Sequence, residues 1–569
     1  MGTLILKDIL IIFLISIPVV LVLRKFHLPP LLGFLATGAI IGPHGIGFIT
    51  DKAQIDILAE LGVTLLLFSV GLEFSFDALE RVRRPGIISA ILQITLTILA
   101  GVVIGFLNWG SLYKGLFFGC IIALSSTAVV FTTLSHFKLL DSVSGRLTTV
   151  ILIFQDLALI PMMVLLPWAA TLTGGESIFQ QLVWQIGKAF FLVASVALIA
   201  QYFADPLFRL ISKGRSRELF VITTIVIGLG MAWLTHSLGL SFALGAFLGG
   251  IMIGATEYQY QALSEIKPFR FCFNSLFFVS IGMLLNFAFL REHYQIVLLL
   301  IFLIPFLKFL ITSFSVLVAG LPLRLAFLIG ISLGQIGEFS FLLAYMGQRT
   351  GAISPFLYQL IIAIAVVAMV ITPPLIQKAP QIADWLASLP IIRKFSFRAQ
   401  DHHMKETSKR LQGHVVICGF GPLGQTFGKL LAQHEIPYMV LELNPETIKR
   451  VRETDRQAFY GDGASEEILY ESGLERARLL AITVPDFLNA AAIIQQARRV
   501  NPNIQIITRA KYRNQVDKLY HAGADVVISE ELEGGLEMGR YALKLLGVEK
   551  ETVDGFLHKV RDFGSADFF

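Results

Sequence analysis

The sequence predicts a chain of two parts, an α-helical membrane domain of many spans followed by a smaller α/β domain. Composition indicates the first part, because 569 residues that are 55% hydrophobic and 15% charged, with a mean hydropathy of +0.71, are too apolar for a soluble globular protein. A change of pattern after Lys378 indicates the second part, because the chain becomes polar and then alternates between strand-like and helix-like segments. We therefore assign 1–378 to the membrane domain, 379–412 to a polar linker, 413–545 to the α/β domain and 546–569 to a C-terminal tail.

The membrane domain contains about 13 apolar segments that can cross a bilayer, found with a window of about 19 residues. Arginine and lysine are concentrated in the loops on one side of these segments, and by the positive-inside rule that side is cytoplasmic. The N-terminus is then outside, and an odd number of spans places the α/β domain in the cytoplasm. Basic residues fall mostly in these short loops and in the polar C-terminal part, so the net charge of +5 does not indicate a nucleic-acid partner. The predicted spans are 4–23, 29–49, 55–74, 86–107, 115–135, 147–171, 181–203, 219–237, 240–256, 270–290, 294–319, 325–347 and 356–378.

Asp156 is the most informative residue of the membrane domain, because it places a carboxylate near the middle of the apolar span 147–171. An ionisable group at that depth is costly unless it faces a cavity or a partner, so it marks an ion or proton path by default. We expect Asp156 and the preceding Gln155 to belong to such a path. The alternative is a structural carboxylate that pairs with a neighbouring helix.

Two other spans carry signs of interrupted helices. One contains three consecutive hydroxyl side chains, and the other contains two glycines and two polar side chains. Unwound backbone and helix ends can replace an ion's hydration shell where they line a cavity, so we expect both segments near an ion site. For the hydroxyl run, helix packing by small residues is the alternative. The polar residues are Ser125, Ser126 and Thr127 of segment 124–128, and Gln335 and Glu338 of segment 334–339.

Lys308 places a cation about midway along the span 294–319. This position is costly unless a carboxylate or a carbonyl faces the ammonium. Pairing with Asp156 or Glu338 would offset two such costs together, whereas snorkelling to the interface is the competing interpretation. Lys308 is therefore included among the candidate site residues.

The α/β domain begins with a strand that leads into a G-x-G-x-x-G motif, formed by Gly419, Gly421 and Gly424. A helix follows, and then a second strand that ends at Glu442, about 20 residues further on. Gly419 makes the tight turn, Gly421 lets the backbone approach a diphosphate, and Gly424 allows close contact between helix and strand. The N–H groups of the helix start then face the phosphates. Together these features are the dinucleotide-binding fingerprint of a Rossmann-like domain.

Glu442 determines which nucleotide fits. Its carboxylate can accept hydrogen bonds from ribose hydroxyls and disfavours a 2′-phosphate, so NAD(H) or an adenine nucleotide such as AMP or ATP is expected rather than NADP. Asp462, after a strand, and Arg509, at the end of another, are candidate base and phosphate contacts, although either could be a solvated loop charge. A domain of this fold that has lost its ligand is the alternative.

These motifs together resemble Kef-type members of the cation:proton antiporter superfamily, which carry a C-terminal potassium-transport nucleotide-binding domain (KTN, or RCK). The resemblance implies a homodimer of inverted-repeat transporters with crossed broken helices, ligand control by the nucleotide domain, a possible ancillary regulatory subunit and a lipid environment in a prokaryotic inner membrane. The motifs that carry it are Gly71-Leu-Glu-Phe74, Leu124-Ser-Ser-Thr-Ala128, Gln155-Asp156, Glu257-Tyr258, Phe277 to Gly282, Gly334-Gln-Ile-Gly-Glu-Phe339 and Tyr460-Gly-Asp462.

The mechanism expected from the residues is exchange by competition. A single carboxylate holds either a proton or a dehydrated cation, and one proton against one monovalent cation moves no net charge. We therefore expect electroneutral antiport of K⁺, or alternatively Na⁺, against H⁺. Asp156 is the shared binding group and the metal ligand, and Gln155 and the Ser125 to Thr127 oxygens complete the coordination. Related antiporters with two adjacent Asp residues tend to be electrogenic, and Gln155 replaces the first Asp here.

Two other functional classes are disfavoured. A ligand-gated K⁺ channel could carry an RCK domain, but no Thr-Val-Gly-Tyr-Gly filter is present and Asp156 would be unexplained. An NAD-dependent membrane enzyme would need an acid, a base and a nucleophile in the cytoplasmic domain, and none is evident, so we expect no enzymatic activity. Pro422 stands where glutathione-gated family members carry Arg, which argues against control by glutathione.

Overall fold

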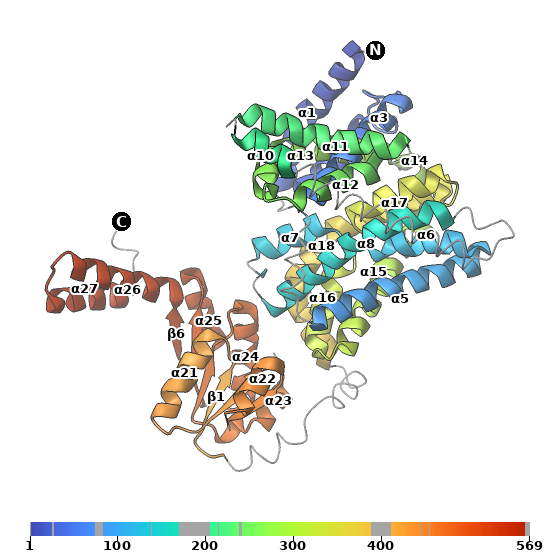
Figure 1. The fold of residues 1–569 in the computed structure, drawn as a ribbon. Coiled ribbons are helices and arrows are strands. Elements are labelled where there is room, and N and C mark those ends of the chain that lie inside the picture. Colours follow the sequence, from blue (N-terminus) through green and yellow to red (C-terminus); the bar gives the residue numbers. More distant parts are fainter. Residues whose placement is uncertain are drawn as a thin grey trace. The chain divides into compact units, whose positions relative to one another are not determined.

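The computed structural model describes residues 2–25, 28–73, 84–137, 139–140, 142–169, 205–213, 216–237, 242–388, 411–443, 445–454 and 456–563. The chain divides into two compact units, with the main boundary between Ala383 and Asp384. The first unit contains the membrane helices, and the second contains a sheet covered by helices (Figure 1).

One group of helices in the membrane unit packs around α3 (Lys52–Glu73). α3 contacts α12 (Phe242–Gly254) and α13 (Gln259–Met283), while α2 contacts α13 and α11 contacts α12. Glycine permits the close approach of α12, since a Cβ on Gly250 would lie 2.2 Å from the carbonyl oxygen of Phe68 on α3. The other helices of this group are α1 (Gly2–Lys25), α2 (Pro30–Ile41), α10 (Asp205–Lys213) and α11 (Arg217–Ser237).

A second group contains both interrupted segments. α15 (Tyr294–Val318) contacts α5 (Arg84–Trp109) and α16, and α6 contacts both α5 and α17. α5 and α6 approach closely because a Cβ on Gly101 would lie 2.1 Å from the Cα of Gly119. The other helices are α6 (Leu112–Ala123), α7 (Thr127–His136), α8 (Val143–Ala169), α14 (Phe287–Glu292), α16 (Leu323–Leu333), α17 (Glu338–Arg349) and α18 (Pro355–Ser388).

Among the described residues, seven helices are long and apolar enough to cross a membrane, and the bent pair α16 and α17 adds an eighth if it forms one span. One of the seven, Leu112–His136, combines α6 and α7. Three shorter apolar helices are Pro30–Ile41, Glu60–Leu72 and Leu244–Gly254. The polytopic helical fold is thus confirmed, and the predicted span 181–203 lies outside the described residues. α18 continues to Ser388, past the expected start of the linker.

The second unit is a six-stranded parallel sheet in the order β3-β2-β1-β4-β5-β6. Alternate side chains enter two cores: Val416 and Cys418 of β1 face one layer of helices, and Val415 and Ile417 face the other. This doubly covered parallel sheet confirms the Rossmann-like class. The strands are β1 (Val415–Cys418), β2 (Tyr438–Glu442), β3 (Gln457–Tyr460), β4 (Leu479–Ile482), β5 (Gln505–Ala510) and β6 (Val526–Ser529).

Helices connect the strands and continue beyond the last one. α26 and α27 pack together through Leu536, Val553 and Leu557, so part of the segment 546–569 that we assigned to a tail is helical. The helices are α21 (Pro422–Gln433), α22 (Pro445–Arg452), α23 (Glu466–Glu471), α24 (Phe487–Val500), α25 (Val516–Ala522), α26 (Glu530–Leu545) and α27 (Lys550–Phe563), with 3₁₀ turns at Leu474–Arg476 and Arg513–Gln515.

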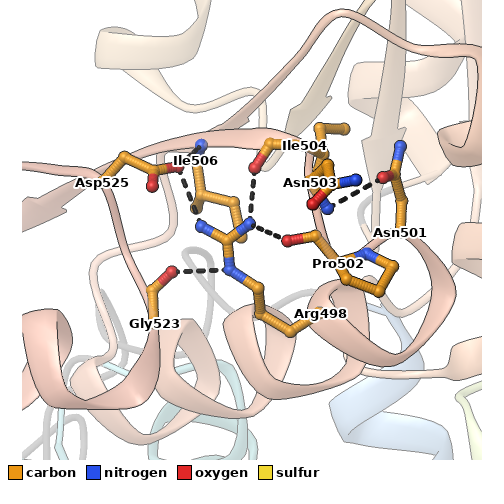
Figure 2. A network of polar contacts seen from close by, with 8 residues as sticks. All are labelled: Arg498, Asn501, Pro502, Asn503, Ile504, Ile506, Gly523 and Asp525. Atoms are coloured by element: carbon orange, nitrogen blue, oxygen red, sulfur yellow. Dashed lines mark hydrogen bonds and ion pairs between the residues drawn. The ribbon is translucent and has the colours of Figure 1, made fainter.

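Arg498 ties the end of α24 to the loops before β5 and β6 (Figure 2). Its planar guanidinium can donate five hydrogen bonds, so one side chain can satisfy several loop carbonyls. It donates to the carbonyl oxygens of Gly523 at 2.9 Å, Pro502 at 2.9 Å and Ile504 at 2.6 Å, and to the carboxylate of Asp525 at 2.9 Å. This network fixes the end of the sheet opposite the glycine loop.

Candidate functional site

The two interrupted segments of the membrane unit touch each other. α6 ends at Ala123 and α7 begins at Thr127, while α16 ends at Leu333 and α17 begins at Glu338 with a bend of 54°. The Gly337 N–H donates to the carbonyl of Leu124 at 3.0 Å, which joins one break to the other. The expected broken helices are therefore present, and they meet in the interior of one helix group.

Gly337 is required at this contact by space rather than by backbone conformation. A Cβ at Gly337 would lie 2.5 Å from both the carbonyl carbon and the carbonyl oxygen of Ser125, closer than real side chains approach. Its N–H and the Leu124 carbonyl could not hydrogen bond if the two segments were pushed apart. The glycine that the sequence places in this span thus permits the two breaks to touch.

Lys308 lies on α15 and forms hydrogen bonds with both breaks. The side chain is fully buried, and its ammonium donates to the carbonyl of Leu124 at 2.9 Å, the hydroxyl of Ser125 at 2.9 Å and the carbonyl of Gln335 at 2.6 Å. These three bonds use all three donors of a lysine. The pairing considered from sequence, with Asp156 or Glu338, is replaced by three neutral oxygens that the unwound segments expose.

Gln155, on α8, holds the first break, which is the segment between α6 and α7. It is fully buried, and its Oε1 accepts from the Ser125 N–H at 2.8 Å while its Nε2 donates to Oε1 of Gln93 at 2.7 Å. Ser125 is engaged further, because its hydroxyl donates to the carbonyl of Leu333 at 2.9 Å. Sequence reasoning missed Gln93, although an amide in the middle of the apolar α5 was a visible signal of a buried polar contact.

Asp156 lies beside the start of α7. The Thr127 hydroxyl contacts both carboxylate oxygens, at 3.1 and 2.9 Å. Asp156 is partly exposed, unlike the fully buried Gln155 before it. Ser126 caps the same helix, since its hydroxyl accepts from the Val129 N–H at 3.2 Å. The start of a helix carries a partial positive charge, which favours an anionic carboxylate at this place.

Gln335 lies in the second break, which is the segment between α16 and α17, and Glu338 is the first residue of α17. Oε1 of Glu338 accepts from the Ala128 N–H at 3.2 Å, so a second carboxylate faces the first turn of α7. The amide of Gln335 satisfies its neighbours when its oxygen accepts from the Ser126 N–H and its nitrogen donates to the Ser332 carbonyl, both at 3.3 Å. The eight membrane residues selected from sequence therefore gather around one pair of helix breaks.

The glycine loop of the second unit has the geometry expected of a phosphate cradle. Gly419 has φ +91°, a conformation that favours glycine. Gly421 precedes α21 and has open space around its Cβ position, whereas a Cβ at Gly424 would lie 2.6 Å from the Gly419 carbonyl oxygen. These positions match the three roles of the motif: turn, approach to a diphosphate, and contact between helix and strand. The residues present fit a nucleotide diphosphate.

The acidic and basic candidates lie at the carboxyl ends of the strands. Glu442, at the end of β2, accepts from the Phe420 N–H at 2.6 Å and the Leu443 N–H at 2.8 Å, which brings its carboxylate against the glycine loop. Asp462 is buried and accepts from the Ala464 N–H at 2.9 Å. Arg509 pairs with Glu530 at 2.6 Å. Burial lowers the pKa of Arg509, and Glu530 opposes that shift.

A family model described as sodium/hydrogen exchanger, transmembrane, matches residues 9–378. The chain belongs to this exchanger family. A second model, described as TrkA-N domain, matches residues 415–530 of this exchanger, the part that contains the parallel sheet. The first matched region contains the two helix breaks, and the second contains the glycine loop.

Proteins similar to this exchanger are named as antiporters. It is 31% identical to "Putative K(+) efflux antiporter KefB" of Alkalimonas amylolytica, over 95% of this chain and 82% of the relative. It is 32% identical to "Putative cation/proton antiporter YbaL" of Escherichia coli (strain K12), over 92% of this chain and 94% of the relative. The predicted resemblance to Kef-type antiporters with a C-terminal KTN domain is confirmed.

The fold of the membrane unit is similar to a solved antiporter. The sodium proton antiporter MjNhaP1 from Methanocaldococcus jannaschii matches with a TM-score of 0.50 and 14% identity, over 67% of this chain and 99% of that structure. At this identity the likeness establishes the fold alone. The exchanger is a cation/proton antiporter by its family, and its relatives are transporters rather than enzymes.

Proposed function

We propose that the chain exchanges one monovalent cation for one proton across a prokaryotic inner membrane, with Asp156 as the shared binding group. The observation that carries this proposal is the place of the carboxylate, at the start of α7 beside the meeting point of two helix breaks. A carboxylate there can bind a proton or a partly dehydrated cation but not both together. Competition for one group couples the two movements in opposite directions.

Electroneutral exchange follows from the charges around the site. The carboxylate of Asp156 binds one positive charge, whether that charge is a proton or a monovalent cation. The Lys308 ammonium is held by backbone and hydroxyl oxygens rather than by this carboxylate. One relative is named as a K(+) efflux antiporter. We therefore favour K⁺ as the cation, with Na⁺ as the second candidate.

The surrounding polar residues divide into ligands and supports in this arrangement. Thr127 is the best-placed additional ligand, because its hydroxyl already contacts Asp156. Gln155, Ser125 and Ser126 were expected to complete the coordination, but their polar atoms form bonds that hold the first break. We assign these three a supporting role in the state described here.

We further propose that an adenine nucleotide or NAD(H) binds the TrkA-N domain and regulates transport. The open space at Gly421 and the helix N-terminus behind it would receive the diphosphate. Glu442 would accept hydrogen bonds from ribose hydroxyls after releasing the Phe420 N–H. Asp462 and Arg509 remain candidates for the base and phosphate contacts.

The assembly and orientation follow from the family resemblance and the loop charges. We propose a homodimer with the N-terminus outside and the nucleotide domain in the cytoplasm, and an ancillary regulatory subunit remains a prediction. Crosslinking in native membranes and protease protection of the C-terminal unit would test these statements independently of transport.

Proton movement in vesicles that contain the purified protein tests the transport proposal. Addition of K⁺ or Na⁺ should move protons in the native protein, and an imposed membrane potential should not change the rate. Asp156→Asn keeps the size of the side chain and should abolish exchange, while Asp51→Asn, a charge removal at an exposed position, should not. Full activity in Asp156→Asn would reject Asp156 as the shared group, and potassium flux without proton movement would indicate a channel.

A further inference from the structure

Gln93 is a fully buried amide in the middle of α5. A buried amide is costly unless its groups are hydrogen bonded. Its Nε2 donates to the Ala123 carbonyl and to the Thr97 hydroxyl, both at 3.2 Å, and its Oε1 accepts from Nε2 of Gln155 at 2.7 Å. The side chain therefore connects α5 both to the last residue of α6 and to α8.

The direction of these bonds is determined by the backbone at the first break. The Ala123 carbonyl can only accept, so the nitrogen of Gln93 faces it and the oxygen faces Gln155. The Ser125 N–H can only donate, so the oxygen of Gln155 faces Ser125. Two amides in series thus satisfy one backbone group on each side of Leu124, groups that the interruption of the helix removes from regular pairing.

We propose that Gln93 is a positioning residue for the ion site, acting through Gln155. Gln93 fixes the Gln155 amide, Gln155 holds Ser125, and the fixed break places Thr127 against Asp156. This inference rests on the proposed function, because the quantity that Gln93 controls is the affinity of Asp156 and Thr127 for the cation. Gln93 acts through Gln155 and Ser125 and is not itself a proposed ligand of the ion.

The amide pair differs from ordinary helix packing in one testable respect. A residue that merely stabilises α5 would change the fraction of the protein in the vesicles that is folded and active, and hence the maximal rate. A residue that sets the geometry of the first break changes the cation concentration at half-maximal rate, since the hydroxyl and carboxylate ligands move relative to each other. The ratio of these two effects separates the roles.

The experiment compares cation dependence of proton movement in vesicles for the native protein, Gln93→Met, Gln155→Met and the double variant. Gln93→Met keeps the length of the side chain and removes its three hydrogen bonds, to Ala123, Thr97 and Gln155. We expect it to raise the half-saturating cation concentration on the order of tenfold, because only the bond to Gln155 acts on the ion site and one buried hydrogen bond has about that effect. Ser89→Ala, on the same helix, removes a buried hydroxyl that donates within α5 to Pro85 at 2.8 Å, and should change neither quantity.

The double variant decides whether Gln93 acts through Gln155. If it does, adding Gln93→Met to Gln155→Met should produce no further change in half-saturation. Additive effects, or a change in maximal rate alone, would overturn the proposal. If Gln93→Met does not reach the membrane, Gln93→Asn keeps the amide but is too short to reach both the Ala123 carbonyl and Gln155, and should give the same shift. An inactive native protein would reject the proposed function and the positioning role with it, whereas an active native protein with unchanged Gln93 variants would reject the positioning role alone.

Discussion

The ammonium of Lys308 lies 2.6 Å from the carbonyl oxygen of Gln335, so a buried charge on α15 is bound to the break between α16 and α17. The same ammonium donates to Leu124 and Ser125 on the other break. Unwound segments at membrane depth expose carbonyls that must find donors within the protein or in a water-filled cavity. Lys308 therefore acts as a structural crosslink that makes both breaks tolerable.

Lys308→Met should destabilise the membrane unit because it removes three buried hydrogen bonds, to the Leu124 and Gln335 carbonyls and the Ser125 hydroxyl, and leaves the Leu124 carbonyl with the Gly337 N–H alone. Loss of such bonds to a charged group costs about 1.5–3 kcal/mol each, an upper bound here because the groups can relax toward other partners. The measurement is thermal unfolding of the purified protein in detergent. Phe306→Leu on the exposed face of the same helix serves as the control and should unfold close to the native temperature. An unchanged melting temperature in Lys308→Met would show that the breaks do not depend on the ammonium.

Gly337→Ala should separate the two breaks. The added Cβ would lie 2.5 Å from the Ser125 carbonyl, and both contact partners are backbone atoms that cannot rotate away. We expect loss of cation-coupled proton movement together with a lower melting temperature. Gly230→Ala is the matched control, because nothing lies within 4 Å of a Cβ at that position on α11, and it should retain transport. Native transport by Gly337→Ala would mean that the contact between the breaks is not needed for exchange.

The sequence predicts the positions of the breaks because their signals are local. Hydroxyls in an apolar span mark one, and glycines beside polar residues mark the other. The partners of Lys308 could not be predicted, since pattern alone does not show which carbonyls an unwound segment exposes. Gln93 was missed for a similar reason: its role depends on α5, α6 and α8 meeting, a contact between residues far apart in sequence.

The fold of the nucleotide domain was easier to predict, because the glycine spacing and an acid at the end of the second strand are local signals of a Rossmann-like domain. The helix that follows Leu545 was not predicted, because α27 is polar on one side and buries only a short apolar stripe against α26. Its helical state depends on that tertiary contact. Composition by itself suggested a tail.

His414 should make the nucleotide domain less stable at acidic pH. Burial lowers the pKa of His414, Arg476 adds to this shift, and the carbonyl of Ser472, 3.0 Å from Nε2, opposes it. The unfolded chain therefore binds the proton more readily than the folded domain. The stability contribution is complete above the ordinary histidine pKa of about 6.5 and is lost as pH falls below it through the folded value.

Amide hydrogen exchange of β1 in the full-length protein, corrected for the intrinsic pH dependence of exchange, measures this effect. Protection should decrease between about pH 7 and pH 5 in the native protein. His414→Gln, which cannot titrate, should show a weaker pH dependence over the same range. His434→Gln, at an exposed position, should behave like the native protein. Equal pH dependence in His414→Gln would assign the effect to other groups.

Substitutions at two glycines of the nucleotide loop should affect nucleotide binding and folding separately. Gly421 has φ −68° and open space at its Cβ position, so Gly421→Ala fits the fold but places a methyl group where the diphosphate would lie. Gly424→Ala would instead meet the Gly419 carbonyl oxygen at 2.6 Å and the Thr483 hydroxyl at 2.9 Å. We expect Gly421→Ala to weaken binding of AMP, ATP or NADH on the order of tenfold or more, as expected when a group cannot approach the phosphates, with no change in melting temperature.

Gly424→Ala should lower the melting temperature of the domain because α21 must move away from β1. Isothermal titration calorimetry of the full-length protein with each nucleotide, combined with thermal unfolding without ligand, measures the two effects separately. Gly555→Ala on α27, where nothing lies within 4 Å of the added Cβ, should change neither. If Gly421→Ala binds every nucleotide as the native protein does, the ligand does not place its phosphates on this loop, and regulation must act through another surface of the domain.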